Sequence, residues 1–111
     1  MVRFLLFFSI NVNLELITFM PHKRIFIKVH GSVIGVNFRY YTNKLAKELG
    51  IYGYVKNCPD HTVEIQAEGA QHKLQKLLSW ANAGPKDGRV DKADHQWQET
   101  KNEFDDFNVL Y

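Results

Sequence analysis

The sequence predicts an α+β fold in which four strands form one antiparallel sheet and two helices cover one of its faces. Segments with strand-like alternation and segments with helical spacing follow one another in the order β-α-β-β-α-β. Glycine or proline marks most boundaries between these segments. Because a helix that connects two strands of one sheet forms a right-handed crossover, both helices are expected on the same face.

The first strand and the first helix have the clearest patterns. Residues 24–30 alternate apolar with polar side chains over most of their length, which is the period of a half-buried strand. Asn37 is the expected N-cap of the helix at 38–49, and Gly50 is expected to end it. The spacing of the apolar residues in this helix predicts one buried face, formed by Phe38, Tyr41, Leu45, Ala46 and Leu49.

The second half of the chain supplies the remaining elements. Residues 52–58 and 62–68 are strand-like, and the Pro-Asp-His between them predicts a hairpin. Residues 70–83 place leucines at helical spacing before a Gly-Pro stop. Residues 89–98 are the expected fourth strand, and the tail at 104–111 has the pattern of a short additional edge strand. This order predicts a ferredoxin-like sandwich.

Length and composition predict one domain preceded by an extension. The chain of 111 residues, 45% of them hydrophobic, is long enough for one core but not for two. Residues 1–21 are interpreted as an N-terminal extension that is disordered or results from a start codon assigned too early, with a packed element or a signal segment as alternatives. Residues 22–111 are the predicted domain.

Charge and cysteine content limit the partners and the location. The net charge is only +2, with basic and acidic residues interspersed, so a nucleic-acid partner is not expected. No apolar stretch approaches the ~18 residues of a membrane span. A single cysteine excludes a disulfide within the chain and indicates a reducing, cytoplasmic compartment. Cys58 and His61 have the spacing of metal ligands, but no second pair follows, so neither a metal nor a cofactor is expected.

The segment between the first strand and the first helix has the features of an anion-binding loop. A helix N-terminus presents unpaired N–H groups and attracts phosphate, and flanking glycines allow the backbone to curl around an anion. Arg39, in the first helical turn, adds a guanidinium group that fits a phosphoryl group. We therefore expect a phosphate or sulfate anion to bind Arg39 and the loop formed by Gly31, Ser32, Val33, Ile34, Gly35 and Val36.

Two motifs in order resemble the acylphosphatase family. Residues 31–39 read GSVIGVNFR, against a family pattern of roughly G-x-V-Q-G-V-x-F-R. Residues 53–64 read GYVKNCPDHTVE, against G-W/Y-V-x-N-x-x-D-G-x-V-E. The resemblance extends over about residues 23–111. Ile34 stands where the family usually has glutamine, and His61 stands where it has glycine.

The resemblance implies a metal-independent enzyme that hydrolyses acyl phosphates to a carboxylate and inorganic phosphate. It assigns the loop amides and Arg39 to the phosphoryl group and Asn57 to the attacking water. Physical chemistry agrees, because a phosphoryl transition state spreads negative charge over oxygens that fixed donors stabilise. As in some members of the family, the Tyr111 carboxylate would hold Arg39 if the tail returned beside the first strand. Thr42 either bonds its own helix backbone or supports the site.

An alternative function from another class stays open at this level. Ferredoxin-like sheets also form non-catalytic binding modules, and fold alone does not decide between the two. An RNA-binding sheet needs exposed aromatic residues on its third strand, which is acidic and non-aromatic here. An anion sensor that binds phosphate without turnover is the other form of this alternative. Hydrolysis of an acyl phosphate by the purified chain separates these functions.

Overall fold

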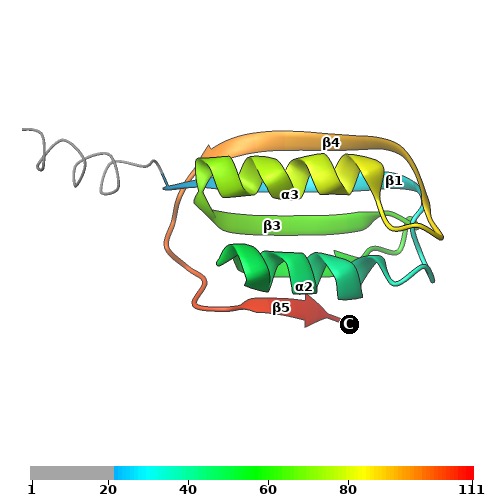
Figure 1. Cartoon of the computed structure of the whole chain (residues 1–111), viewed down its shortest axis with the longest axis horizontal. Coiled ribbons are helices and arrows are strands. Elements are labelled where there is room, and N and C mark those ends of the chain that lie inside the picture. Colours follow the sequence, from blue (N-terminus) through cyan, green and yellow to red (C-terminus); the bar gives the residue numbers. More distant parts are fainter. Residues whose placement is uncertain (1–21) are drawn as a thin grey trace, which may run out of the picture.

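Two helices cover one face of a five-stranded sheet in the computed structural model of this protein, which describes residues 22–111 (Figure 1). The predicted N-terminal extension at residues 1–21 lies outside the described residues. No helix within 22–111 has the length and apolar character needed to cross a membrane. The strands are β1 (His22–Ser32), β2 (Tyr52–Asn57), β3 (Val63–Ala70), β4 (Arg89–Glu99) and β5 (Phe107–Leu110), and the helices are α2 (Phe38–Leu49) and α3 (Gln71–Ala83).

The sheet has the strand order β4-β1-β3-β2-β5. The first four of these strands pair in antiparallel fashion, as predicted. The fifth strand pairs with β2 in parallel, with Gly53 opposite Phe107 and Lys56 opposite Leu110. The tail forms the short edge strand that its pattern indicated, and the predicted sheet of four antiparallel strands is corrected to a mixed sheet of five. The pairing of β5 has no local signal in the sequence, because it depends on the path that the chain takes after β4.

The strand directions determine where the loops meet. Since β1 and β2 both run antiparallel to β3, they run parallel to each other, and β5 follows β2. The carboxyl ends of these three strands consequently lie at the same end of the sheet. This arrangement brings the β1–α2 loop, Asn57 at the end of β2 and the residues after β5 to one end of the molecule.

The core lies between the sheet and the two helices. Its central members are fully buried aliphatic side chains of β1 and β3, packed against leucines of α3 and against Phe38 and Ala46 of α2. The bounds of α2 agree with the prediction, but its buried face differs. Thr42 is buried, whereas Tyr41 is 42% exposed. A small hydroxyl residue can occupy the closely packed position because its polar atom bonds within the helix, and the larger ring is left at the surface.

The predicted loop after the first strand begins later than expected. Gly31 and Ser32 continue β1 and pair with Val90 and Arg89 of β4 after a register shift. Gly31 has a φ of 135°, and a Cβ at this position would lie 2.1 Å from the carbonyl oxygen of Arg89. The glycine thus allows a close approach of β1 and β4, and the irregular loop is reduced to residues 33–37.

A segment at residues 100–106 carries the chain from β4 at one edge of the sheet to β5 at the other. Figure 1 shows this segment descending past the end of the sheet where β1 begins. The buried Glu68 carboxylate holds it, accepting hydrogen bonds from the backbone N–H groups of Lys101, Asn102 and Glu103 and from the Thr100 hydroxyl. Glu68 therefore fixes the position from which β5 starts.

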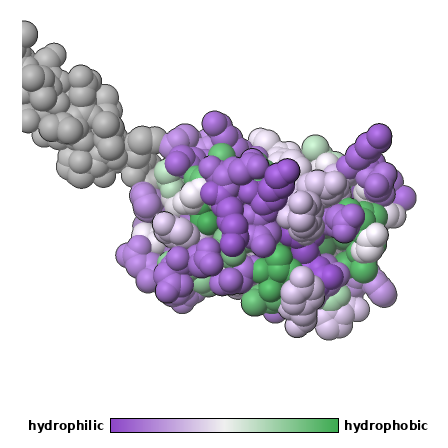
Figure 2. Space-filling view, turned by 60° about the horizontal axis from the view of Figure 1, so that its bottom comes forward, coloured by the Kyte–Doolittle hydropathy of each residue, from purple (hydrophilic) through white to green (hydrophobic). Residues whose placement is uncertain are grey.

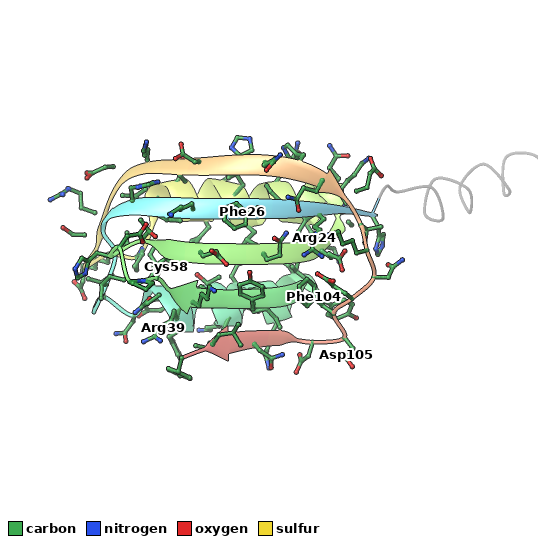
Figure 3. All side chains as sticks on the ribbon, turned by 180° about the vertical axis from the view of Figure 1, so that it is seen from behind. Arg24, Phe26, Arg39, Cys58, Phe104 and Asp105 are labelled. Atoms are coloured by element: carbon green, nitrogen blue, oxygen red, sulfur yellow. The ribbon has the colours of Figure 1, made fainter. Side chains whose placement is uncertain are left out.

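Arg24 completes this cluster from β1. Its guanidinium lies 3.5 Å from Glu68, pairs with Glu103 and stacks on the Phe104 ring at 5.2 Å (Figure 3). Burial would raise the pKa of Glu68, but the four hydrogen bonds from the segment outweigh burial and lower it below the ordinary value of 4.5. A carboxyl group with a lowered pKa stabilises the fold above its ordinary pKa and loses that contribution as the pH falls through the folded value.

We expect Glu68→Ala to lower the free energy of unfolding by about 3 kcal/mol at neutral pH, because it leaves a buried guanidinium short of its partner. The deficit should shrink at acidic pH, as the native carboxyl takes up a proton below its lowered pKa. Urea denaturation at both pH values measures this difference. Glu99→Ala is the control, since the Glu99 side chain is 88% exposed. A deficit at neutral pH no larger than that of the control would contradict the role of Glu68.

Candidate active site

A pocket of about 320 Å³ lies at the end of the sheet where β1, β2 and β5 end. This volume is at the lower end of the range for small-molecule sites. Arg39 and Asn57, predicted from two separate motifs, both line it. Figure 3 shows Arg39 and Cys58, the neighbour of Asn57, at this end of the sheet, with Arg24 and Phe104 toward the other. The lining residues are Val33, Gly35, Asn37, Phe38, Arg39, Tyr40, Asn43, Asn57, Val109 and Tyr111.

Arg39 is the cationic residue in the lining of this pocket. The side chain makes no hydrogen bond or ion pair with another residue of the range 22–111. Its guanidinium carbon lies 4.8 Å from the centre of the Tyr111 ring. Stacking occupies a face of the planar group and leaves the N–H donors at its edge available. An arginine held in this way is suited to bind an anion with two parallel hydrogen bonds.

The loop at residues 33–37 forms the wall of the pocket next to Arg39. The φ angle is positive at Gly35 and Asn37 and is not positive at Val36 between them. Alternation of this kind turns successive N–H groups toward one side of the backbone and creates a concave anion site. A Cβ at Gly35 would have no atom within 4 Å, so there is open space beside this glycine. The loop thus has both the backbone geometry and the room for an oxyanion.

The six residues predicted to form the loop are not all in the same place. Val33 and Gly35 line the pocket. Gly31 and Ser32 belong to β1, as described above, and Ile34 is 38% exposed at the surface. Val36 faces a separate hollow formed with Tyr41, Trp80, Gly84, Pro85, Lys86 and Asp87. The pocket wall is therefore shorter than the sequence motif.

Asn57 is placed by the hairpin that follows it. It ends β2 opposite Val63, and its side chain is half-buried. The Cys58 N–H donates to the carbonyl of Thr62 at 2.8 Å, and the His61 N–H donates to the carbonyl of Cys58 at 3.1 Å. His61 adopts a φ of 64°, the left-handed conformation that glycine, usual at this position in the family pattern, adopts more easily.

Asp60 anchors the same hairpin. Its carboxylate accepts hydrogen bonds from the hydroxyl and the N–H of Thr62 and lies 2.9 Å from the ammonium group of Lys28 on β1. The hydrogen bond from the Thr62 hydroxyl, followed by that from Lys28, holds the pKa of Asp60 far below its ordinary value. These contacts tie the turn after Asn57 to β1, an interior strand of the sheet.

Asn43 is a polar residue of the pocket that the motifs did not reveal. Its side-chain oxygen is buried and has no hydrogen-bond partner among the described residues. Since Asn43 follows Arg39 by four positions on α2, both side chains lie on the same helical face. This spacing was the only signal in the sequence. A buried acceptor without a partner is costly unless a water or a ligand donates to it.

The two supporting residues predicted from the sequence have different positions. The Thr42 hydroxyl donates to the carbonyl of Phe38 at 2.8 Å inside α2, so it bonds its own helix. The Tyr111 carboxylate was expected to hold Arg39 if the tail returned beside β1. The tail lies beside β2 and not beside β1, so this condition is not met. Tyr111 contacts Arg39 through its ring. Within residues 22–111, no group of three or more His, Cys, Asp or Glu side chains is arranged to hold a metal ion.

The comparisons with known proteins agree with the two motifs. The family model described as Acylphosphatase matches residues 25–109. The chain belongs to the acylphosphatase family. The acylphosphatase of Archaeoglobus fulgidus is 45% identical over 85 residues, which cover 77% of this chain and 94% of the relative. The acylphosphatase of Pasteurella multocida is 42% identical over 83 residues, which cover 75% and 92%.

Solved structures extend the similarity to the fold. The crystal structure of the acylphosphatase from Bacillus subtilis superimposes with a TM-score of 0.77 at 30% identity and covers 80% of this chain and 99% of its own. The acylphosphatase from Coxiella burnetii gives a TM-score of 0.72 at 32% identity, with coverage of 80% and 93%. This chain therefore has the acylphosphatase fold over nearly the full length of these two structures.

Removal of the Tyr111 ring should weaken anion binding at Arg39. An exposed cation–π contact stabilises by about 0.5–1 kcal/mol, so we expect Tyr111→Ala to raise the Kd for inorganic phosphate about two- to fivefold. Tyr111→Phe keeps the ring and should bind phosphate like the parent chain. Titration calorimetry measures the three constants. Equal affinity of Tyr111→Ala and the parent would show that the ring does not position Arg39.

Proposed function

We propose that this acylphosphatase hydrolyses acyl phosphates to a carboxylate and inorganic phosphate in the pocket that Arg39 and Asn57 share. The observation that carries the proposal is the meeting of a guanidinium unpaired within residues 22–111, an amide side chain and a loop with the backbone geometry of an anion site. These groups match the needs of phosphoryl transfer, where charge stabilisation and positioning supply most of the catalysis. Family membership supports the same activity.

The phosphoryl group binds first in this proposal. The N–H groups of residues 33–37 and the N-terminus of α2 hold its oxygens on one side, and the edge of the Arg39 guanidinium holds them on another. All of these donors are in place before the reaction, so they stabilise the growing negative charge without reorganisation. The Phe38 side chain is 2% exposed, which fixes the first turn of α2 in the core and with it the direction of Arg39.

Water attacks phosphorus in the next step. The side-chain oxygen of Asn57 accepts one hydrogen of the water, and the unpartnered oxygen of Asn43 accepts the other. The new P–O bond forms as the bond from phosphorus to the bridging oxygen breaks, and the electron pair leaves with the carboxylate. A proton from the water passes to a phosphate oxygen or to solvent. Because a carboxylate is a good leaving group, no strong general acid is required.

Three further parts of the proposal concern conditions and partners. Hydrolysis does not depend on a metal ion, because the chain's own donors supply the positive charge. Phosphate and sulfate compete with the substrate for the loop and Arg39, whereas nucleic acid is not a partner. The protein is located in the cytoplasm in this proposal, because a single cysteine indicates a reducing compartment.

Hydrolysis of benzoyl phosphate in the presence of EDTA is the first test. We expect turnover with competitive inhibition by inorganic phosphate, and we expect Arg39→Ala to lower kcat/KM about 10³-fold or more, as for other arginines that stabilise a transferring phosphoryl group. Arg39→Lys keeps the charge but loses the planar fork and should recover only part of the activity. Phosphate binding by the parent chain without any turnover would instead identify an anion sensor.

The two asparagines should affect turnover more than binding. We expect Asn57→Ala to lower kcat about 10²-fold or more, because the water loses its orientation. Asn43→Ala removes one acceptor and should lower kcat about tenfold. The inhibition constant of phosphate, measured in the same assays, should change little in either variant. Asn82→Ala, on the exposed side of α3, is the matched control. A kcat of Asn57→Ala equal to that of the parent would contradict the role of Asn57 in orienting the water.

A further inference from the structure

Large hydrophobic side chains are exposed around the phosphate pocket. Among residues 22–111, the large apolar or aromatic side chains that remain exposed are Ile34, Tyr40, Tyr41, Tyr52, Leu110 and Tyr111. Four of these six lie in the β1–α2 loop, in the first turn of α2 or directly after β5. We call these four, Ile34, Tyr40, Tyr41 and Tyr111, the apolar rim.

Contacts within the rim connect it to the pocket. Tyr40 and Tyr111 line the pocket, and both are well exposed, at 60% and 100%. The Tyr41 ring meets the Tyr40 ring edge-on, with 5.1 Å between their centres. Ile34 lies in the loop between the two lining residues Val33 and Gly35. Figure 2 shows hydrophobic residues in small separate groups, among them one at the right-hand end and one at the lower middle, on a face that is mainly hydrophilic.

The side-chain charge of the pocket lining comes from one residue, at the phosphoryl end. Of the described residues that line it, Arg39 alone has a charged side chain. In an acyl phosphate, a single oxygen joins phosphorus to the acyl carbon. An acyl group therefore lies within a few bond lengths of Arg39, next to Tyr40 and Tyr111, the two rim residues that line the pocket. A second negative charge on the acyl group would find no cation of its own there.

We infer that the apolar rim binds the acyl group, so that this chain favours acyl phosphates with apolar acyl groups over small or anionic ones. The inference rests on the proposed hydrolysis of acyl phosphates and names its substrate class. Burial of apolar surface against Tyr40 and Tyr111 supplies the preference. An aromatic ring can in addition stack on the tyrosines. The rim thus recognises the acyl group, the part of the substrate that the loop and Arg39 do not contact.

A series of straight-chain acyl phosphates tests the inference. Acetyl, butanoyl and hexanoyl phosphate have leaving groups of nearly equal acidity, so the series varies only the apolar length. Full burial of a methylene would change kcat/KM about fourfold, and a partly exposed rim gives less. We expect hexanoyl phosphate to exceed acetyl phosphate about tenfold in kcat/KM, mainly through KM, and succinyl phosphate to fall below butanoyl phosphate.

Two variants assign the preference to the rim. Tyr40→Ser should reduce the ratio of kcat/KM between hexanoyl and acetyl phosphate from about tenfold to about threefold or less. The ratio is insensitive to a general loss of activity, since both substrates share the phosphoryl end. Tyr52→Ser is the matched control, because this tyrosine is also exposed but begins β2, at the end opposite Asn57. The ratio of kcat/KM between hexanoyl and acetyl phosphate in Tyr52→Ser should equal that of the parent.

Alkyl phosphonates separate this inference from the proposed reaction. Hexylphosphonate and methylphosphonate carry the same charged group and cannot be hydrolysed, so calorimetry measures their binding without any chemistry. We expect the parent to bind hexylphosphonate about tenfold more tightly than methylphosphonate. In Tyr40→Ser this difference between the two phosphonates should be smaller. Equal binding of the two phosphonates, or an unchanged ratio in Tyr40→Ser, would overturn the role of the rim. Tighter binding of hexylphosphonate without turnover of any acyl phosphate would overturn the proposed hydrolysis alone.

Discussion

The common direction of β1, β2 and β5 is the constraint on which the site depends. Because these strands end at the same side of the sheet, the loop before α2, the amide of Asn57 and the ring of Tyr111 meet there without any long excursion of the chain. The two edges of the resulting pocket come from opposite halves of the sequence. A sheet with β5 in any other position would leave Arg39 without its stacking partner.

The position of β5 depends in turn on a buried cluster at the far end of the sheet. Glu68 takes up the backbone N–H groups of the connecting segment, and Arg24 balances its charge. Glu68 lies on β3, which has no residue in the pocket. Polar contacts at one end of the sheet thus position a wall of the pocket at the other end. The strand β5 lies between the two and connects them rigidly.

The sequence was informative wherever the deciding forces are local. The bounds of α2 followed from apolar spacing and from the stop at Gly50, and the two motifs pointed to Arg39 and Asn57, which both line the pocket. The left-handed conformation of His61 occurs where the sequence departs from the glycine of the family pattern. In each case, neighbours within a few positions determine the conformation.

Tertiary choices could not be predicted in the same way. The parallel pairing of β5 with β2 depends on the cluster around Glu68, and the extension of β1 through Gly31 depends on β4. The burial of Thr42 in place of Tyr41 reflects how closely α2 packs on the sheet. Asn43 was overlooked because a polar residue on a helix has no signature beyond its spacing from Arg39.

The two ends of the domain have unequal surroundings. His22 begins β1 at the end of the sheet opposite the pocket, whereas Tyr111 forms part of the pocket wall (Figure 1). A polypeptide fused after Tyr111 would start beside Arg39 and crowd the entrance. For immobilisation, affinity tags or reporter fusions, the side of the chain that precedes His22 is therefore the suitable point of attachment.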